Sequence, residues 1–127
     1  MMNGKSQTVG GKSHAEGSKT IAFENNSHAE GNETFAAGKH SHAEGNTTTA
    51  IGNSAHAEGA KTLAEANYSH AEGENAKATG TAAHAQNFYT EATGDYSHAE
   101  GNNCEATNSM AHAEGYETMA TGYAAHS

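Results

Sequence analysis

The sequence predicts an all-β fold, a parallel β-solenoid built from coils of 14 residues. Three observations support this prediction. Nine of the ten histidines lie 14 residues apart, from His14 to His126, and only His40 lies off this spacing. Small residues alternate with larger ones around each of these histidines, which is the period of a β-strand. Glycine recurs about every seven residues and would interrupt a helix, even though alanine and glutamate favour one.

The first strand of each coil is predicted over the pattern Ser-His-Ala-Glu-Gly. In an extended strand, the serine, alanine and glycine of this pattern point to one side, and the histidine and glutamate point to the other. Because a buried carboxylate is costly, we expect the small residues inside the coil and the histidine and glutamate columns outside. The pattern occupies 13–17, 27–31, 41–45, 69–73 and 97–101, with variants that begin with alanine at 55–59 and 111–115.

The second strand is predicted seven residues later, over the weaker pattern Thr-x-Ala-x-Gly. Examples are TTAIG at 48–52 and AKATG at 76–80, and alanine fills all eight central positions from Ala22 to Ala120. Each coil is therefore expected to have two strands and two turns marked by glycine, and to stack on the next coil at about 4.8 Å in parallel register. The interior would contain little more than alanine, serine, threonine and glycine.

The composition indicates one repeat domain over residues 1–127, about eight and a half coils, expected to be a fragment of a longer fibrous protein. Hydrophobic residues make up 34%, mostly alanine, so a single stack buries little large apolar surface and association along one face is expected. Six lysines, no arginine and a net charge of −9 argue against nucleic acid as a partner. Cys104 is the single cysteine, and no apolar run is long enough for a signal peptide or a membrane span, so we expect no membrane contact by this segment.

These repeats resemble the Hep/Hag repeats in the head domains of YadA-like trimeric autotransporter adhesins. The resemblance rests on the small-x-Ala-x-Gly-x-x pattern in 14-residue coils and covers nearly the whole chain, from SQTVG at 6–10 onward. It implies a left-handed parallel β-roll that forms a homotrimer on the bacterial cell surface and attaches to a host surface or matrix component. Histidine and glutamate stand where that family commonly has an apolar pair. The repeats also resemble shaft segments of bacteriophage tail fibres and tail spikes, which gives an alternative location in the virion tail.

We expect the Ser-His-Ala-Glu-Gly strand to face the threefold axis or the neighbouring subunit, because its outward columns hardly vary from coil to coil. In the alternative arrangement, the apolar residues of the other strand pack at the axis. Glutamates stacked in register repel one another, and we expect histidines of a neighbouring chain to offset them, with raised pKa values. Trimer stability would then fall as the pH rises through the histidine pKa. The predicted ladder comprises His14, His28, His42, His56, His70, His84, His98 and His112 with Glu16, Glu30, Glu44, Glu58, Glu72, Glu100 and Glu114.

No cofactor is expected, and three alternatives stay open for the space between the histidines of a trimer. The ladder is purely structural, or it holds axial chloride, another small anion or water, or it holds a metal ion. A uniform ladder is weak evidence for a metal, because specific sites use a defined set of ligands. No enzyme is expected either, since the chain has no catalytic motif and its repeated pairs lack the convergence of different groups that an active site needs.

The outward residues of the second strand are apolar only as far as Leu63 and become polar beyond it. We interpret the apolar part as a candidate surface for a partner or an adjacent domain, and single scattered apolar residues are the alternative. Thr79, Thr93, Thr107 and Thr121 form an outward threonine column, which makes ice binding a minor alternative. The coil at 83–94 has Gln86 and Asn87 in place of glutamate and glycine, and we expect a small loop distortion there. The candidate partner surface consists of Ile21, Phe23, Phe35, Ile51 and Leu63.

Overall fold

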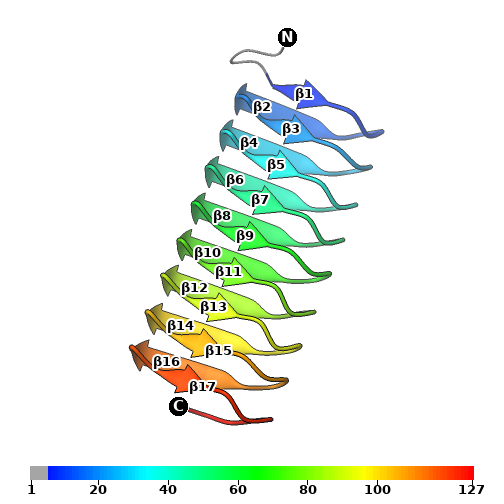
Figure 1. Ribbon diagram of the computed structural model, residues 1–127. Coiled ribbons are helices and arrows are strands. Elements are labelled where there is room, and N and C mark those ends of the chain that lie inside the picture. Colours follow the sequence, from blue (N-terminus) through cyan, green and yellow to red (C-terminus); the bar gives the residue numbers. More distant parts are fainter. Residues whose placement is uncertain (1–5) are drawn as a thin grey trace.

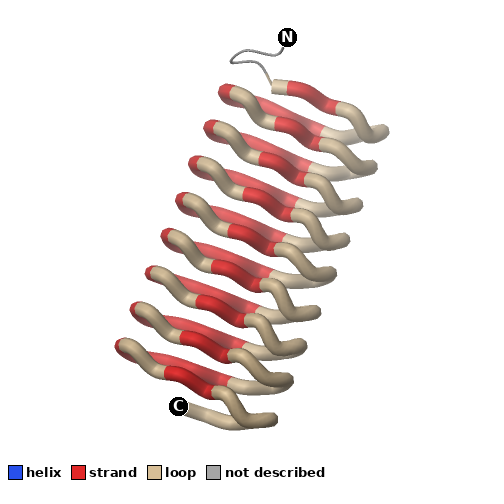
Figure 2. Tube along the Cα trace, in the orientation of Figure 1, coloured by secondary structure: helices blue, strands red, loops and turns tan. Residues whose placement is uncertain are grey.

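The structure, a computed structural model, describes residues 6–127, which form one continuous stack of coils (Figure 1). This part of the chain contains no helix, and its 17 strands form two parallel sheets, one of nine strands and one of eight. The strands of the two sheets alternate along the chain, so each coil contributes one strand to each sheet (Figure 2). The predicted parallel β-solenoid of 14-residue coils is confirmed.

The coil is left-handed, as Figure 1 allows the reader to follow. The odd-numbered strands cross the front of the view from left to right, the even-numbered strands return behind them, and the chain descends from the N-terminus to the C-terminus. Strands of the eight-stranded sheet are β2 (His14–Ser18), β4 (His28–Asn32), β6 (His42–Asn46), β8 (His56–Ala60), β10 (His70–Glu74), β12 (His84–Phe88), β14 (His98–Asn102) and β16 (His112–Tyr116). Strands of the nine-stranded sheet are β1 (Gln7–Thr8), β3 (Ile21–Ala22), β5 (Phe35–Ala36), β7 (Thr49–Ala50), β9 (Leu63–Ala64), β11 (Lys77–Ala78), β13 (Glu91–Ala92), β15 (Glu105–Ala106) and β17 (Met119–Ala120).

Every strand pairs with the equivalent residues of the next coil, with no slip in register. Histidine lies opposite histidine and alanine opposite alanine, as in β4 and β6, where His28 pairs with His42 and Ala29 with Ala43. A one-residue slip would turn the small residues outward and bring histidine and glutamate into the interior, so the alternation itself fixes the register. Each column of the repeat therefore becomes a straight row of side chains along the solenoid.

The interior is filled by small side chains from both sheets. Alanines of the two strand columns are fully buried from coil to coil, and the largest fully buried side chains are threonine and cysteine. Buried serines donate to a turn carbonyl three residues earlier, as Ser41 Oγ does to the Gly38 oxygen at 2.6 Å. This part of the prediction is confirmed: two layers of backbone approach closely because the buried side chains between them are alanine, serine, threonine and one cysteine.

The glycines of the Ser-His-Ala-Glu-Gly pattern do not point into the interior, so that part of the prediction was wrong. Gly31 and its equivalents are mostly exposed and have φ between 107° and 119°, a region that side chains disfavour. At these glycines the regular alternation of inward-facing and outward-facing residues ends. The glycines of the other half-repeat, such as Gly52, are the buried ones, and a Cβ atom there would overlap the carbonyl oxygen of Ala66 in the next coil.

The turns also differ from the prediction, because most of their left-handed residues are not glycine. His40, Tyr68 and Met110 all have φ near 60°, as do other polar and apolar residues at the same columns. Their backbone N–H groups donate to a carbonyl of the preceding coil, for example His40 N to Asn25 O at 3.1 Å. We infer that these inter-coil hydrogen bonds offset the cost of the left-handed conformation.

The irregular coil at 83–94 does not interrupt the stack, so the expected loop distortion is confined to one residue. Strand β12 pairs in full register with β10 and with β14. Asn87 takes the place of glycine with φ 84°, and asparagine is one of the few residues that tolerate positive φ. Asn87→Gly is expected to raise the free energy of unfolding by about 1 kcal/mol, measured by urea denaturation, because it removes this strain. Unchanged or lower stability would show that the positive φ of Asn87 is not a source of strain.

Six threonines place a hydroxyl in the interior without a hydrogen-bond partner among the described residues. They are Thr20, Thr34, Thr48, Thr62, Thr90 and Thr118. An unpaired buried hydroxyl is costly, whereas valine has nearly the same shape without the polar atom. Thr48→Val is therefore expected to raise the free energy of unfolding by about 1 kcal/mol, and Thr49→Val, which alters the outward neighbour, should change it by less than ~0.5 kcal/mol. Equal effects of the two substitutions would show that Thr48 is not inside.

No helix in the described part of the chain is long and apolar enough to cross a membrane.

Candidate functional site: the histidine–glutamate face

The repeated histidines and glutamates form one continuous surface on the outer side of the eight-stranded sheet. We call it the histidine–glutamate face. Each even-numbered strand begins at its histidine and places its glutamate two residues later, so both side chains point away from the interior. The structure brings together every residue of the predicted ladder. The face comprises His14, His28, His42, His56, His70, His84, His98, His112 and His126 with Glu16, Glu30, Glu44, Glu58, Glu72, Glu100 and Glu114.

The imidazole rings stack on one another along this face. From His28 to His112 the centroids of successive rings are 4.7–4.8 Å apart and the ring planes lie within 14° of parallel. At the first coil the order changes, because the rings of His14 and His28 meet nearly at right angles. The spacing equals the separation of neighbouring strands, so the sheet itself imposes the stack.

The carboxylates lie beside the histidine row within the same chain. His56 Nε2 is 3.7 Å from one oxygen of Glu58, and the other oxygen of Glu58 is 4.0 Å from Nε2 of His70 in the next coil. Glu72 contacts His70 and His84 in the same way, at 3.9 and 3.4 Å. The sequence analysis expected a neighbouring chain to bring histidines to the glutamates. In the structure, histidines of the same chain already lie within 4.0 Å of the glutamates, and contacts from a neighbouring chain stay a prediction.

Most of the histidine Nε2 atoms are shielded from solvent yet lack a hydrogen bond. The side chains of His28 and His84 keep 39% and 33% of their surface exposed, but the Nε2 atoms themselves are buried. The carboxylate oxygens lie at 3.4–4.0 Å, too distant or too poorly aligned to accept a hydrogen bond. Buried nitrogens without a partner occur at His28, His42, His56, His70, His84, His98 and His112.

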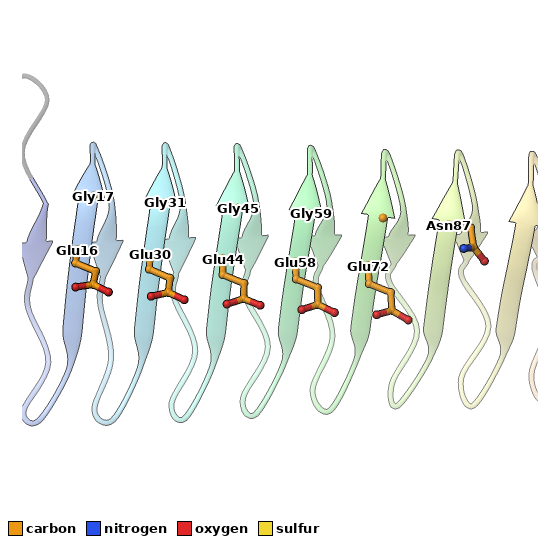
Figure 3. Close-up of a pocket in the computed structure, with 11 residues that line it drawn as sticks. Glu16, Gly17, Glu30, Gly31, Glu44, Gly45, Glu58, Gly59, Glu72 and Asn87 are labelled. Atoms are coloured by element: carbon orange, nitrogen blue, oxygen red, sulfur yellow. The ribbon is translucent and has the colours of Figure 1, made fainter.

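A groove of about 1000 Å³ runs along one edge of this face. Glycines such as Gly31 and Gly45 form its floor, because they have no side chain to fill the space, and the glutamates form its wall. Figure 3 shows Glu16, Glu30, Glu44, Glu58 and Glu72 in a single row with their carboxylates directed the same way. Asn87 lies at the end of the groove, where an amide side chain replaces the glycine. The groove is thus acidic from Glu16 to Glu72.

Gln86 replaces one glutamate of the row without breaking it. Its amide donates a hydrogen bond to the carboxylate of Glu100 in the next coil. Because an amide is neutral, the histidine–glutamate face carries no negative charge at this coil. The adjoining residues Phe88 and Tyr89 are exposed and pack against each other edge to face at 4.5 Å.

The pKa values of His70, His84 and His98 are lowered, which is opposite to the raised values that the sequence analysis expected. Burial is the main cause, and the charge that the next histidine would bear adds to it, as His84 does for His70. The nearby carboxylates raise these pKa values by less. The single chain therefore favours neutral histidines at these three positions.

Acidification is expected to destabilise the folded chain. Since the folded-state pKa values of these three histidines lie below their ordinary value of 6.5, the unfolded chain binds more protons than the folded chain below that pH. Their contribution to stability is present above about pH 6.5 and is lost as the pH falls towards the lowered pKa values. Melting curves followed by circular dichroism should show a lower Tm at about pH 5.5 than at about pH 7.5. A Tm that rises on acidification would contradict the lowered pKa values.

The candidate partner surface lies on the opposite side, on the outer face of the nine-stranded sheet. Ile21 pairs with Phe35 across β3 and β5, and the rings of Phe23 and Phe35 meet edge to face at 6.3 Å. Phe23 and Ile51 remain 47% and 44% exposed. Leu63 follows Thr49 in the same column and is half-buried. The five residues therefore form one patch over β3 to β9.

Two features of the histidine–glutamate face were not predicted from the sequence. His126 extends the imidazole stack, with its ring 4.6 Å from that of His112, and its place on the 14-residue spacing was the available signal. The groove depends on the exposure of the glycine column, and no sequence signal distinguishes a glycine with positive φ from an inward-facing one.

No protein-family model and no curated protein matches this chain.

Proposed function

We propose that the chain is a rigid segment of a homotrimeric extracellular fibre that attaches to a host surface or matrix component, as the head of a bacterial surface adhesin would. The observation that supports this most is the continuous stack of in-register coils around an interior with no side chain larger than threonine. Such a stack forms a stiff rod, and it offers long rows of identical groups in place of a converging active site. A structural and adhesive role fits this geometry better than catalysis does.

The thin interior favours association with further chains. Alanine burial removes little apolar surface from water, so one stack gains less from its core than a domain packed with leucine or phenylalanine. The histidine–glutamate face has five-residue strands and regular, half-buried side chains, whereas the outer surface of the nine-stranded sheet changes character along its length. We propose the former as the face that meets the neighbouring subunits, with the charge of its glutamates offset partly by its histidines.

The mass of the tag-free chain in solution tests the trimer. Sedimentation equilibrium should give three times the chain mass of 13.0 kDa, about 39 kDa. The mass of a single chain at micromolar protein concentrations would contradict the trimer. The rod would then have to be stable as a single chain.

The attachment role predicts that the apolar patch over β3 to β9 contributes to binding. Beads coated with the chain should adhere to host cells or to immobilised matrix proteins, and Phe23→Ser with Ile51→Ser should reduce adhesion, because exposed apolar patches are common contact sites. Thr107→Ser on the polar half of the same sheet serves as the control. Adhesion equal for all variants would reject this patch, and no adhesion by the parent chain would reject the attachment role.

A further inference from the structure

We propose that the histidine–glutamate face binds divalent transition-metal ions of the zinc, nickel and copper class, each held by two histidines of successive coils and the glutamate between them. All three ligands of a site come from one chain, so the proposal does not depend on the trimer. It goes beyond the proposed fibre role, because it assigns a ligand to the surface that was considered for assembly.

The geometry already brings complete ligand sets together. In five His–Glu–His groups, one nitrogen of each histidine and one carboxylate oxygen all lie within 4.8 Å of one another. Metal–nitrogen and metal–oxygen bonds of about 2.0–2.2 Å place tetrahedral ligand atoms roughly 3.3–3.5 Å apart. The observed Nε2–oxygen distances of 3.4–4.0 Å are close to this range, and ligand atoms as much as 4.8 Å apart must approach one another by side-chain rotation when the ion binds. The groups are His14–Glu16–His28, His28–Glu30–His42, His56–Glu58–His70, His70–Glu72–His84 and His112–Glu114–His126.

The histidine nitrogens lack another partner. Nε2 atoms of seven histidines on this face are buried and form no hydrogen bond, although each ring stands beside a carboxylate. A buried nitrogen without a partner is costly, and a metal ion would accept its lone pair. This observation is independent of the distances. In a simple ion pair the nitrogen would form a hydrogen bond, and in a water-filled gap it would be exposed to solvent.

The charge of the face also calls for cations. Seven glutamates lie in register along it, and the one lysine–glutamate pair of the described residues, Lys19 with Glu33, lies in the turns and not on this face. Like charges one strand apart repel each other. A divalent ion bound at a carboxylate would replace this repulsion with attraction. Two imidazoles and one carboxylate form a mixed nitrogen and oxygen set, which suits zinc, nickel and copper, whereas calcium and magnesium prefer oxygen ligands alone.

Sharing of histidines limits how many sites can be filled at once. Two of the five groups share His28 and two share His70, while the group around Glu114 shares no ligand, so three groups can be occupied together. One coordination position of each tetrahedral ion would stay open for water or for a donor of another chain. The proposal therefore predicts three ions per chain at saturation.

Equilibrium dialysis of the tag-free, metal-stripped full chain against zinc chloride near neutral pH tests the proposal. Saturation at three ions per chain is expected, together with a Tm that rises with zinc concentration, because the ion binds the folded state. Glu114→Gln removes a ligand from the isolated group and should lower the stoichiometry to two. Glu117→Gln, in the following turn, lies outside all five groups and should leave it at three.

Two outcomes overturn the proposal: less than one ion bound per chain at millimolar zinc, or the same stoichiometry for Glu114→Gln and Glu117→Gln. Copper loading adds a second readout, since imidazole ligands are expected to give nitrogen hyperfine splitting in the electron paramagnetic resonance spectrum, which a site of carboxylates alone would lack. The mass measured with and without zinc separates this proposal from the trimer. A monomer with three zinc ions supports the metal sites and rejects the trimer, and a trimer that binds no zinc does the reverse.

Discussion

Replacing Gly45 with alanine is expected to lower the free energy of unfolding by about 3 kcal/mol or more, the combined effect of backbone strain and steric overlap. Gly45 has φ 116°, where an L side chain is disfavoured. A Cβ atom there would also overlap the carbonyl oxygen of Gly59 in the next coil, and that oxygen belongs to a backbone fixed by the sheet. The coils would have to separate locally, with loss of inter-strand hydrogen bonds.

Gly115 provides the matched control for this substitution. Its φ of 113° is nearly the same, but its Cβ atom would meet only the Thr118 side chain at 3.6 Å. Gly115→Ala should therefore retain only the backbone term, about 1–2 kcal/mol. Urea denaturation of both variants measures the difference. If both variants lose the same free energy of unfolding, the close approach of Gly45 to Gly59 is not what excludes a side chain at this position.

Enlarging an interior alanine is the second substitution with a large expected effect. Ala78 is the last residue of β11 and is fully buried, so Ala78→Leu should lower the free energy of unfolding by about 3 kcal/mol, at the upper end for overpacked cores. The interior cannot expand easily, because hydrogen bonds fix both sheets to the coils above and below. The side chain would force the two layers apart.

The neighbouring residue tests whether this effect comes from the interior. Lys77 lies next to Ala78 in the same strand but is exposed, so Lys77→Leu should change the free energy of unfolding by less than ~0.5 kcal/mol. Thermal melting followed by circular dichroism distinguishes the pair. A tolerated leucine at 78 together with a damaging one at 77 would invert the assignment of inside and outside.

The repeat spacing made most of the fold predictable. Histidines and alanines recur every 14 residues, and the structure pairs those same residues from coil to coil, as His42 with His56 and Ala43 with Ala57. Alternation also gave the correct side for Ala43 and His42. These predictions succeeded because period and side are properties of a strand in any context.

Backbone conformation could not be predicted in the same way. The glycine that ends the Ser-His-Ala-Glu-Gly pattern was expected inside, but Gly31 is exposed with positive φ. Turn residues such as Tyr68 adopt the left-handed conformation without being glycine, since hydrogen bonds to the preceding coil hold them there. Both features depend on contacts between coils, which the conformational preferences of single residues do not include.

The candidate site was predictable in its members and not in its electrostatics. The sequence placed histidine and glutamate on one outer face, and the structure agrees for every residue of the ladder. In the single chain the pKa values of His70, His84 and His98 are lowered, whereas raised values were expected in a trimer, because stacked rings bury one another and oppose each other's charge. That balance depends on the distance between coils and on solvent exposure, which a repeat pattern does not contain.

Spin labels on the two faces test most directly whether chains associate through the histidine–glutamate face. Cys104→Ala removes the native thiol, and alanine already fills the same buried column at Ala76. Labels are then attached at Glu58→Cys on the histidine–glutamate face or at Glu65→Cys on the exposed outer side of the other sheet. Double electron–electron resonance should give a shorter distance between chains for position 58 than for position 65. A shorter distance for position 65, or no coupling between chains at either position, would contradict assembly through this face.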